Sequence, residues 1–131
     1  MTDTELLARF ERIELDDFRH ADHVRVAWAY LERDGAGPAL EALVRGLKAV
    51  ALAKGHPEKF HYTLTRAWLD LIVVERQRHP DVTSAADLLA RVPALADPRY
   101  VRRFYADATL DGEAARRGWV PPDRWPFDAR L

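Results

Sequence analysis

Apolar side chains recur every three or four positions through much of this chain, which is the spacing of one face of an α-helix. The clearest stretch lies between Pro38 and Gly55. Its apolar positions are Leu40, Leu43, Val44, Leu47, Val50 and Ala51. Because proline suits a first helical turn and glycine often follows the last one, we predict an amphipathic helix that starts at Pro38 and is closed by Gly55.

Similar spacing predicts helices elsewhere, and no polar and apolar alternation is long enough to indicate a strand. The predicted segments are Asp3–Ile13, Phe18–Arg33, Phe60–Arg78, a short helix capped by Thr83 or Ser84 that runs through Val92, and Asp111–Gly118, with Arg99–Tyr105 following a turn. Asp16 and Asp17 are candidate caps for the second segment. We therefore predict an all-α fold, an irregular helical bundle of about five to seven helices.

The last part of the chain does not suit a regular helix. Prolines recur between Trp119 and Phe127, and they lack a backbone donor and restrict the residue before them. The segment contains too many aromatic residues for a disordered tail. Because 131 residues match the usual size of one domain, we predict a single helical domain over residues 1–131 with an extended C-terminal strap over residues 119–131.

The amino-acid composition limits the kinds of partner that we expect for this chain. The 20 basic and 21 acidic residues leave a net charge of −1, so the chain lacks the basic surface that phosphate binding needs and we expect no nucleic acid partner. It has no cysteine, so any metal must use nitrogen and oxygen ligands. The sequence has neither a signal peptide nor an apolar stretch that spans a bilayer, so we expect no membrane partner and a cytoplasmic location.

Three histidines are the main candidate for chemistry. His20 and His23 are three residues apart, which places both side chains on neighbouring positions of one helix face. His61 opens a later helix and shares its apolar side with Trp68 and Ile72. If the two helix starts lie together, the three imidazoles are expected to surround one cavity.

Three neutral imidazoles with an open fourth position are a known arrangement for a catalytic metal. The first hypothesis is therefore a metal-dependent enzyme that acts on a small molecule and binds a divalent transition metal (iron, zinc, copper or manganese) through His20, His23 and His61. Acidic residues that could complete the site are Asp16, Asp17 and Glu58. Thr65 is a nearby hydroxyl and Tyr105 a candidate for proton transfer.

Two other hypotheses stay open. In one, the histidines are structural and the chain is a non-catalytic binding or interaction module, a monomer or a homodimer, whose strap docks on itself or on a partner. In the other, a single histidine acts as a general base without metal. The sequence contains no Gly-rich phosphate-binding loop, no serine nucleophile-elbow motif and no His-Glu-x-x-His motif. The motifs that mark nucleotide-binding proteins, serine hydrolases and zincin metalloproteases are therefore absent. His56 and His79 look like loop residues and are left outside the site.

The segment from Phe18 to Trp28 contains His-x-x-His-Val, and the segment from Phe60 to Trp68 contains Phe-His-x-Thr-x-Thr. With these motifs the chain resembles a family of small bacterial all-helical proteins of uncharacterised activity, in which the second motif reads Tyr/Phe-His-x-Thr-x-Thr. The likeness extends to Phe104-Tyr105, Leu110, Ala115-Arg116, Trp119-Val120 and Pro122-Asp123. The resemblance implies a shared helical architecture and a shared histidine pattern.

Overall fold

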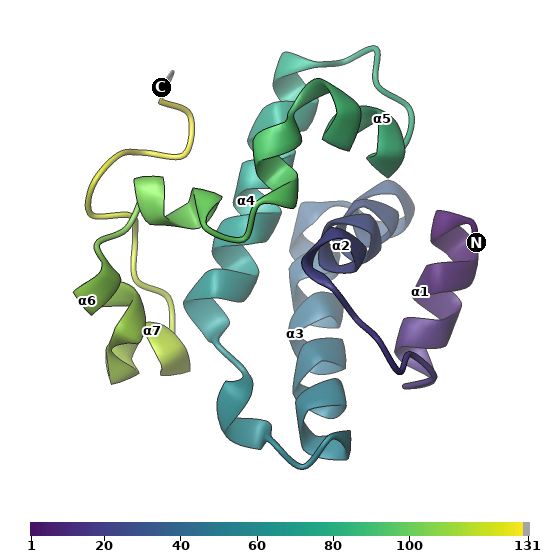
Figure 1. The fold of residues 1–131 in the computed structure, drawn as a ribbon. Helices are drawn as coiled ribbons and strands as arrows, with labels where there is room; N and C mark the ends of the chain where they lie inside the picture. The colour runs from purple at the N-terminus through teal and green to yellow at the C-terminus, as the bar shows by residue number, and fades with distance from the viewer. Residues whose placement is uncertain (130–131) are drawn as a thin grey trace.

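The computed structural model describes residues 1–129 and confirms the all-α prediction. Those residues contain no strand (Figure 1). The α-helices are α1 (Asp3–Glu11), α2 (His20–Asp34), α3 (Ala36–Ala53), α4 (Tyr62–Arg78), α5 (Ala85–Arg91), α6 (Asp107–Asp111) and α7 (Glu113–Arg117). Short 3₁₀-helices are η1 (Pro57–Lys59), η2 (Pro93–Ala96) and η3 (Tyr100–Arg103). Within the described residues, no helix has both the length and the apolar character needed to cross a membrane.

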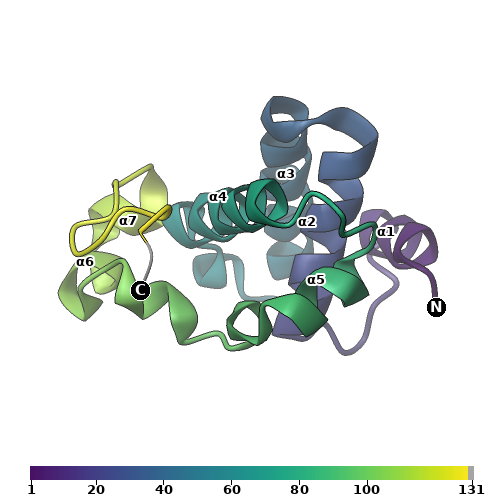
Figure 2. The ribbon, with the colours of Figure 1, turned by 90° about the horizontal axis from the view of Figure 1, so that it is seen from above.

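Helices α2, α3 and α4 pack against one another and form the centre of the molecule. Helix α1 packs on α2, and α5 and η2 pack on α2 as well. Seen from above, α4 lies between the α2–α3 pair and the α6–α7 pair (Figure 2). Helix α1 and the C-terminal strap therefore lie at opposite sides of the fold.

Close packing between α1 and α3 depends on Gly46. A Cβ atom at this position would lie 2.6 Å from Cζ of Phe10, which is too close for two carbon atoms. Phe10 is buried and its ring also packs against Phe18 and Tyr30. The glycine therefore lets the Phe10 ring lie directly on the backbone of α3.

Several predicted boundaries are corrected by helix capping. Helix α2 begins at His20 because the backbone N–H of Arg19 donates to Oδ2 of Asp22 at 3.1 Å. Asp17 instead pairs with the Arg19 side chain, so the predicted caps Asp16 and Asp17 do not start the helix. Helix α3 begins at Ala36, two residues before Pro38, because Gly35 with φ 79° separates it from α2.

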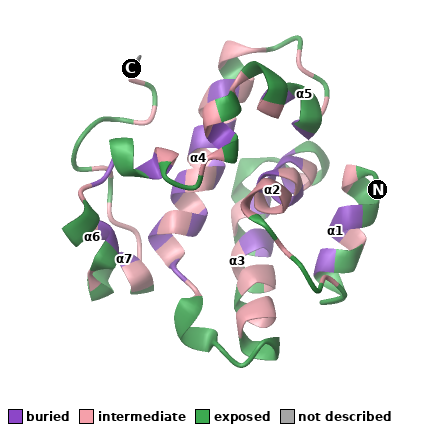
Figure 3. Ribbon diagram, in the orientation of Figure 1, coloured by how far each residue is buried: buried purple, intermediate pink, exposed green. Residues whose placement is uncertain are grey.

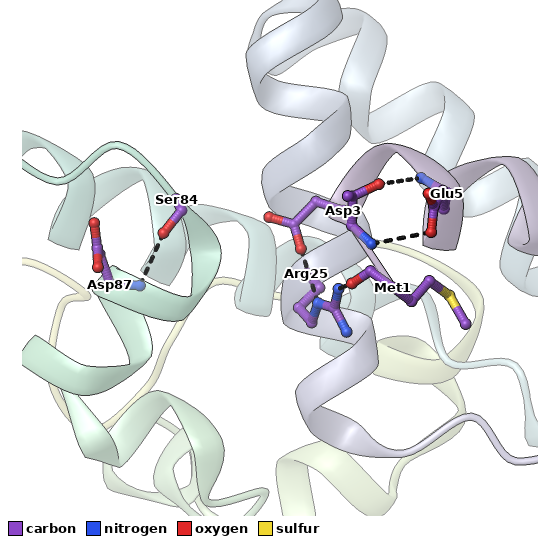
Figure 4. Close-up of polar contacts among 7 residues, drawn as sticks. Met1, Asp3, Glu5, Arg25, Ser84 and Asp87 are labelled. Carbon is purple, nitrogen blue, oxygen red and sulfur yellow. Dashed lines mark hydrogen bonds and ion pairs between the residues drawn. The ribbon is translucent and has the colours of Figure 1, made fainter.

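The later boundaries also differ from the prediction. Helix α4 begins at Tyr62 because His61 is its N-cap. The segment predicted as one helix over Asp111–Gly118 is two short helices that meet at Gly112. For α5, Ser84 rather than Thr83 is the cap, since its hydroxyl accepts from the Asp87 N–H at 3.1 Å (Figure 4).

The first helix is fixed to the second by charge-assisted hydrogen bonds. Thr2 and Glu5 form a capping box that starts α1. Arg25 of α2 reaches across to this end, donating to Oδ1 of Asp3 at 2.8 Å and to the Met1 carbonyl at 2.6 Å (Figure 4). These contacts attach α1 to the N-terminal half of α2.

The C-terminal strap packs on its own chain. The Thr63 hydroxyl, fully buried in α4, donates to the Gly118 carbonyl at 2.6 Å and accepts from the Val120 N–H at 3.0 Å. Farther along, the Phe127 ring packs against Phe104, Tyr105 and Trp119. Of the predicted strap, residues 119–129 therefore cover one side of α4 and η3, and residues 130–131 lie outside the described part of the chain.

Candidate functional site

A cavity of about 440 Å³ lies where α2 and α4 begin and where α3 ends. Most of its wall is apolar, and Pro98, Val101 and Arg102 also line it. The apolar side chains include Phe18, Val24, Leu47, Phe60, Leu64 and Trp68. This volume is enough for a small organic molecule.

The structure brings the three predicted histidines to the wall of this one cavity. His20 and His23 lie in the first turn of α2, and His61 immediately precedes α4. Thr65, the predicted hydroxyl, lines the same cavity. The starts of α2 and α4 therefore lie together, which is the condition on which the shared cavity was predicted.

His61 uses both ring nitrogens for hydrogen bonds within the protein. Nδ1 accepts from the Leu64 N–H at 3.0 Å, which caps α4, and Nε2–H donates to the Leu110 carbonyl at 2.7 Å. The side chain is only 9% exposed. An imidazole with this pair of bonds is neutral and has no lone pair left for a metal. His61 is thus a capping residue that also connects α4 to α6.

Only one ring nitrogen of His20 makes a hydrogen bond within the described structure. Its Nε2–H donates to the Leu95 carbonyl at 2.9 Å, which fixes the tautomer and leaves Nδ1 as the acceptor of the ring. The ring also packs on the Trp68 indole, with centroids 4.2 Å apart. Burial lowers the pKa of His20, and the Leu95 carbonyl and the Asp97 charge only partly oppose that shift.

His23 is held by stacking. Its ring lies against the Phe18 ring with centroids 4.2 Å apart and planes 21° apart. The pKa of His23 is lowered to about 4, mainly by burial; repulsion from His20 and Lys54 adds to the lowering, and the charge of Asp22 opposes it. His20 and His23, with ring centroids 6.4 Å apart, are therefore a neutral pair at pH 7.

These contacts do not fit a metal site with three histidine ligands. Within residues 1–129, no group of three or more histidine, aspartate or glutamate side chains is placed to hold a metal ion. The acidic candidates do not line the cavity. Glu58 lies 3.3 Å from the exposed His56, Asp17 pairs with Arg19, and Asp16 is exposed. His61 would have to release the start of α4 before it could bind a metal.

The two residues predicted to assist catalysis have other roles. Tyr105 is fully buried and does not line the cavity; its hydroxyl donates to the Val120 carbonyl at 2.7 Å, and burial raises its pKa above the usual value. Thr65 lies at the cavity, but its hydroxyl donates to the His61 carbonyl at 2.8 Å. Tyr105 thus anchors the strap, and Thr65 bonds within its own helix.

The sequence predictions missed the cationic residues of this cavity. Lys54, Lys59 and Arg102 line it, and no aspartate or glutamate among the described residues does. One signal was present in the sequence, because the only lysines of the chain are Lys48, Lys54 and Lys59. Exposed lysines usually form part of the solvated surface, so only the fold shows that two of them border a cavity.

Stability is expected to depend on His23 in mildly acidic solution. The pKa of His23 is lowered to about 4 in the folded chain, while an unfolded histidine titrates near 6.5. Below pH 6.5 the unfolded state therefore binds a proton that the folded state does not, and stability falls as pH falls toward 4. Between pH 7 and pH 5 we expect His23 to account for a loss of about 2 kcal/mol.

Urea unfolding at both pH values measures this loss. The His23→Gln variant is expected to lose about 2 kcal/mol less than wild type over the same interval. His56→Gln, which changes an exposed histidine, is the matched control and should follow wild type. Equal losses for wild type and His23→Gln would show that His23 is not buried in its neutral form.

Comparison of the chain with protein-family models, curated proteins and solved structures finds no match, so the resemblance to the small bacterial helical family stays a prediction.

Proposed function

We propose that this chain binds a small, largely apolar organic molecule in the histidine-lined cavity. The observation that carries this proposal is the state of His20: a neutral imidazole in an apolar wall, with Nε2 fixed by the Leu95 carbonyl and Nδ1 left as an acceptor. A ligand hydroxyl or N–H would donate to Nδ1, while apolar atoms of the ligand would pack on Trp68 and Phe60. Sites for small molecules commonly combine an apolar wall with a few such polar groups.

The same contacts favour binding over metal-dependent chemistry. The hypothesis of a metal-dependent enzyme needs three imidazole lone pairs, and His61 has none to give while it caps α4. Acid–base chemistry at His20 or His23 is also disfavoured, because a general base works best when its pKa lies near the working pH and burial lowers both values. The non-catalytic binding module is thus the hypothesis that the geometry supports best.

Filling the cavity tests the proposal. Ala51 lines the cavity, whereas Ala53 on the same helix is exposed and does not. With 1-octanol as an uncharged probe, we expect Ala51→Phe to weaken binding about tenfold, which corresponds to about 1.4 kcal/mol, because the new ring occupies space that the probe needs. Ala53→Phe should bind the probe as wild type does.

Isothermal titration calorimetry measures the affinity, and circular dichroism checks that both variants fold. The proposal fails if 1-octanol does not bind to the wild-type chain. It also fails if Ala51→Phe and Ala53→Phe bind the probe equally well, since the probe would then lie elsewhere.

A further inference from the structure

We propose that the ligand is an organic carboxylate whose apolar body fills the cavity and whose carboxylate group is held at the rim by Lys54 and Lys59. This inference rests on the proposed function, because it assumes that the cavity binds a small molecule. It adds the chemical class of that molecule.

The cavity has cationic residues at its edge and no anionic ones. Its cationic residues are Lys54, Lys59 and Arg102, and no carboxylate side chain among residues 1–129 lines it. Arg102 already has a partner, since its guanidinium donates to Oδ1 of Asp107 at 2.6 Å. Neither Lys54 nor Lys59 forms an ion pair in the described structure. Neither ammonium group therefore has a carboxylate within ion-pairing distance, although the charge of Lys59 acts on the neighbouring Glu58.

The two lysines border the cavity from the same short stretch of chain. Lys54 is the C-cap of α3, and Lys59 ends η1, which leads into His61 and α4. This stretch is exposed, as the green end of α3 and the loop after it show (Figure 3). A lysine in this position packs its apolar stem on the wall and keeps its ammonium in water. The charge of Lys54 also acts on His23, so it lies near the histidine end of the cavity.

The charges and the apolar wall of the cavity favour some classes of ligand over others. An amine would place a third positive charge beside two unpaired ones, which is unfavourable. A phosphate group is commonly held by a bidentate arginine as well as by ammonium groups, but Arg102, the one arginine that lines the cavity, is already paired with Asp107. A single carboxylate matches the two flexible ammonium groups, and an apolar body matches the wall.

Three probes with the same eight-carbon tail separate the classes: octanoate, 1-octanol and octylammonium. By isothermal titration calorimetry at pH 7 and low salt, we expect octanoate to bind about fivefold more tightly than 1-octanol, because each exposed ion pair contributes modestly. Octylammonium should bind most weakly. The preference for octanoate over 1-octanol should shrink in 0.5 M sodium chloride, since salt screens exposed charges.

The variant that tests the assignment is Lys54→Met/Lys59→Met. It should lose the preference for octanoate and bind 1-octanol as wild type does. Arg45→Met, which removes an exposed positive charge on the same helix as Lys54 but outside this cavity, is the matched control and should keep the preference.

The outcomes distinguish this inference from the proposed function. If octanoate and 1-octanol bind wild type equally, the cavity binds small molecules but the carboxylate inference is overturned. If octanoate is preferred and the double variant keeps that preference, the assignment to Lys54 and Lys59 is overturned. If 1-octanol does not bind, the proposed function fails, and the inference, which rests on it, fails with it.

Discussion

Replacing His61 by leucine is expected to lower the free energy of unfolding by about 3 kcal/mol. Leucine fills similar space but neither accepts from the Leu64 N–H nor donates to the Leu110 carbonyl, the two bonds that His61 makes. The site is 91% shielded from solvent, so water replaces these bonds poorly. The loss is expected to combine about 1 kcal/mol for the helix cap with about 2 kcal/mol for an unpaired buried carbonyl.

The His61→Asn variant separates these two parts. Asparagine is a good N-cap, but its side chain is shorter and is not expected to reach the Leu110 carbonyl, so we expect a loss of about 2 kcal/mol. Urea unfolding at pH 7 gives both values. A His61→Leu variant within 0.5 kcal/mol of wild type would contradict the capping role. Added zinc should change the unfolding midpoint of wild type and His61→Asn equally, whereas a zinc ligand at His61 would make zinc stabilise wild type alone.

Replacing Thr63 by valine is expected to lower the free energy of unfolding by roughly 2 to 3 kcal/mol. Valine has nearly the same shape, so the change removes the hydroxyl without creating a large cavity. The Gly118 carbonyl and the Val120 N–H would both lose their partner on α4. The strap would then stay attached mainly through the Tyr105 hydroxyl and the packing of Phe127.

Thr65→Val is the matched control on the same helix. Its hydroxyl donates only to the His61 carbonyl, which also accepts from the Thr65 N–H at 3.2 Å. Removing it leaves no unpaired group, so we expect a change of less than about 1 kcal/mol. Thermal unfolding followed by circular dichroism compares the two variants. Equal losses for Thr63→Val and Thr65→Val would contradict the account of Thr63 as the joint between α4 and the strap.

Periodicity was enough to predict the helices that form the cavity. The repeats after Pro38 and after Phe60 mark α3 and α4 to within a few residues, because an amphipathic helix must bury its apolar face. The same geometry placed His20 and His61 toward the interior. Periodicity does not show which distant segments of the chain come into contact. The carbonyls of Leu95 and Leu110, which accept hydrogen bonds from His20 and His61, lie in such distant segments.

Those distant partners decide what each candidate residue does. Residue type makes His61 equally suited to binding a metal and to capping a helix, and only the Leu64 N–H and the Leu110 carbonyl show which applies. Tyr105 was predicted to transfer protons because of its hydroxyl, but that hydroxyl donates a hydrogen bond to the Val120 carbonyl of the strap. Lys54 and Lys59 line the cavity but were not predicted as site residues, because in the sequence they resemble ordinary exposed lysines.

The most direct test of the account is the protonation state of the His20 and His61 imidazoles with and without a ligand. Long-range ¹H–¹⁵N NMR at pH 7 reports which ring nitrogen carries the proton. We predict that His20 and His61 are both neutral and protonated on Nε2, and that saturating 1-octanol shifts the Nδ1 resonance of His20 while both nitrogens of His61 stay unchanged. A His20 Nδ1 resonance that does not move on saturation, or a His61 ring whose Nδ1 carries the proton, would contradict the account.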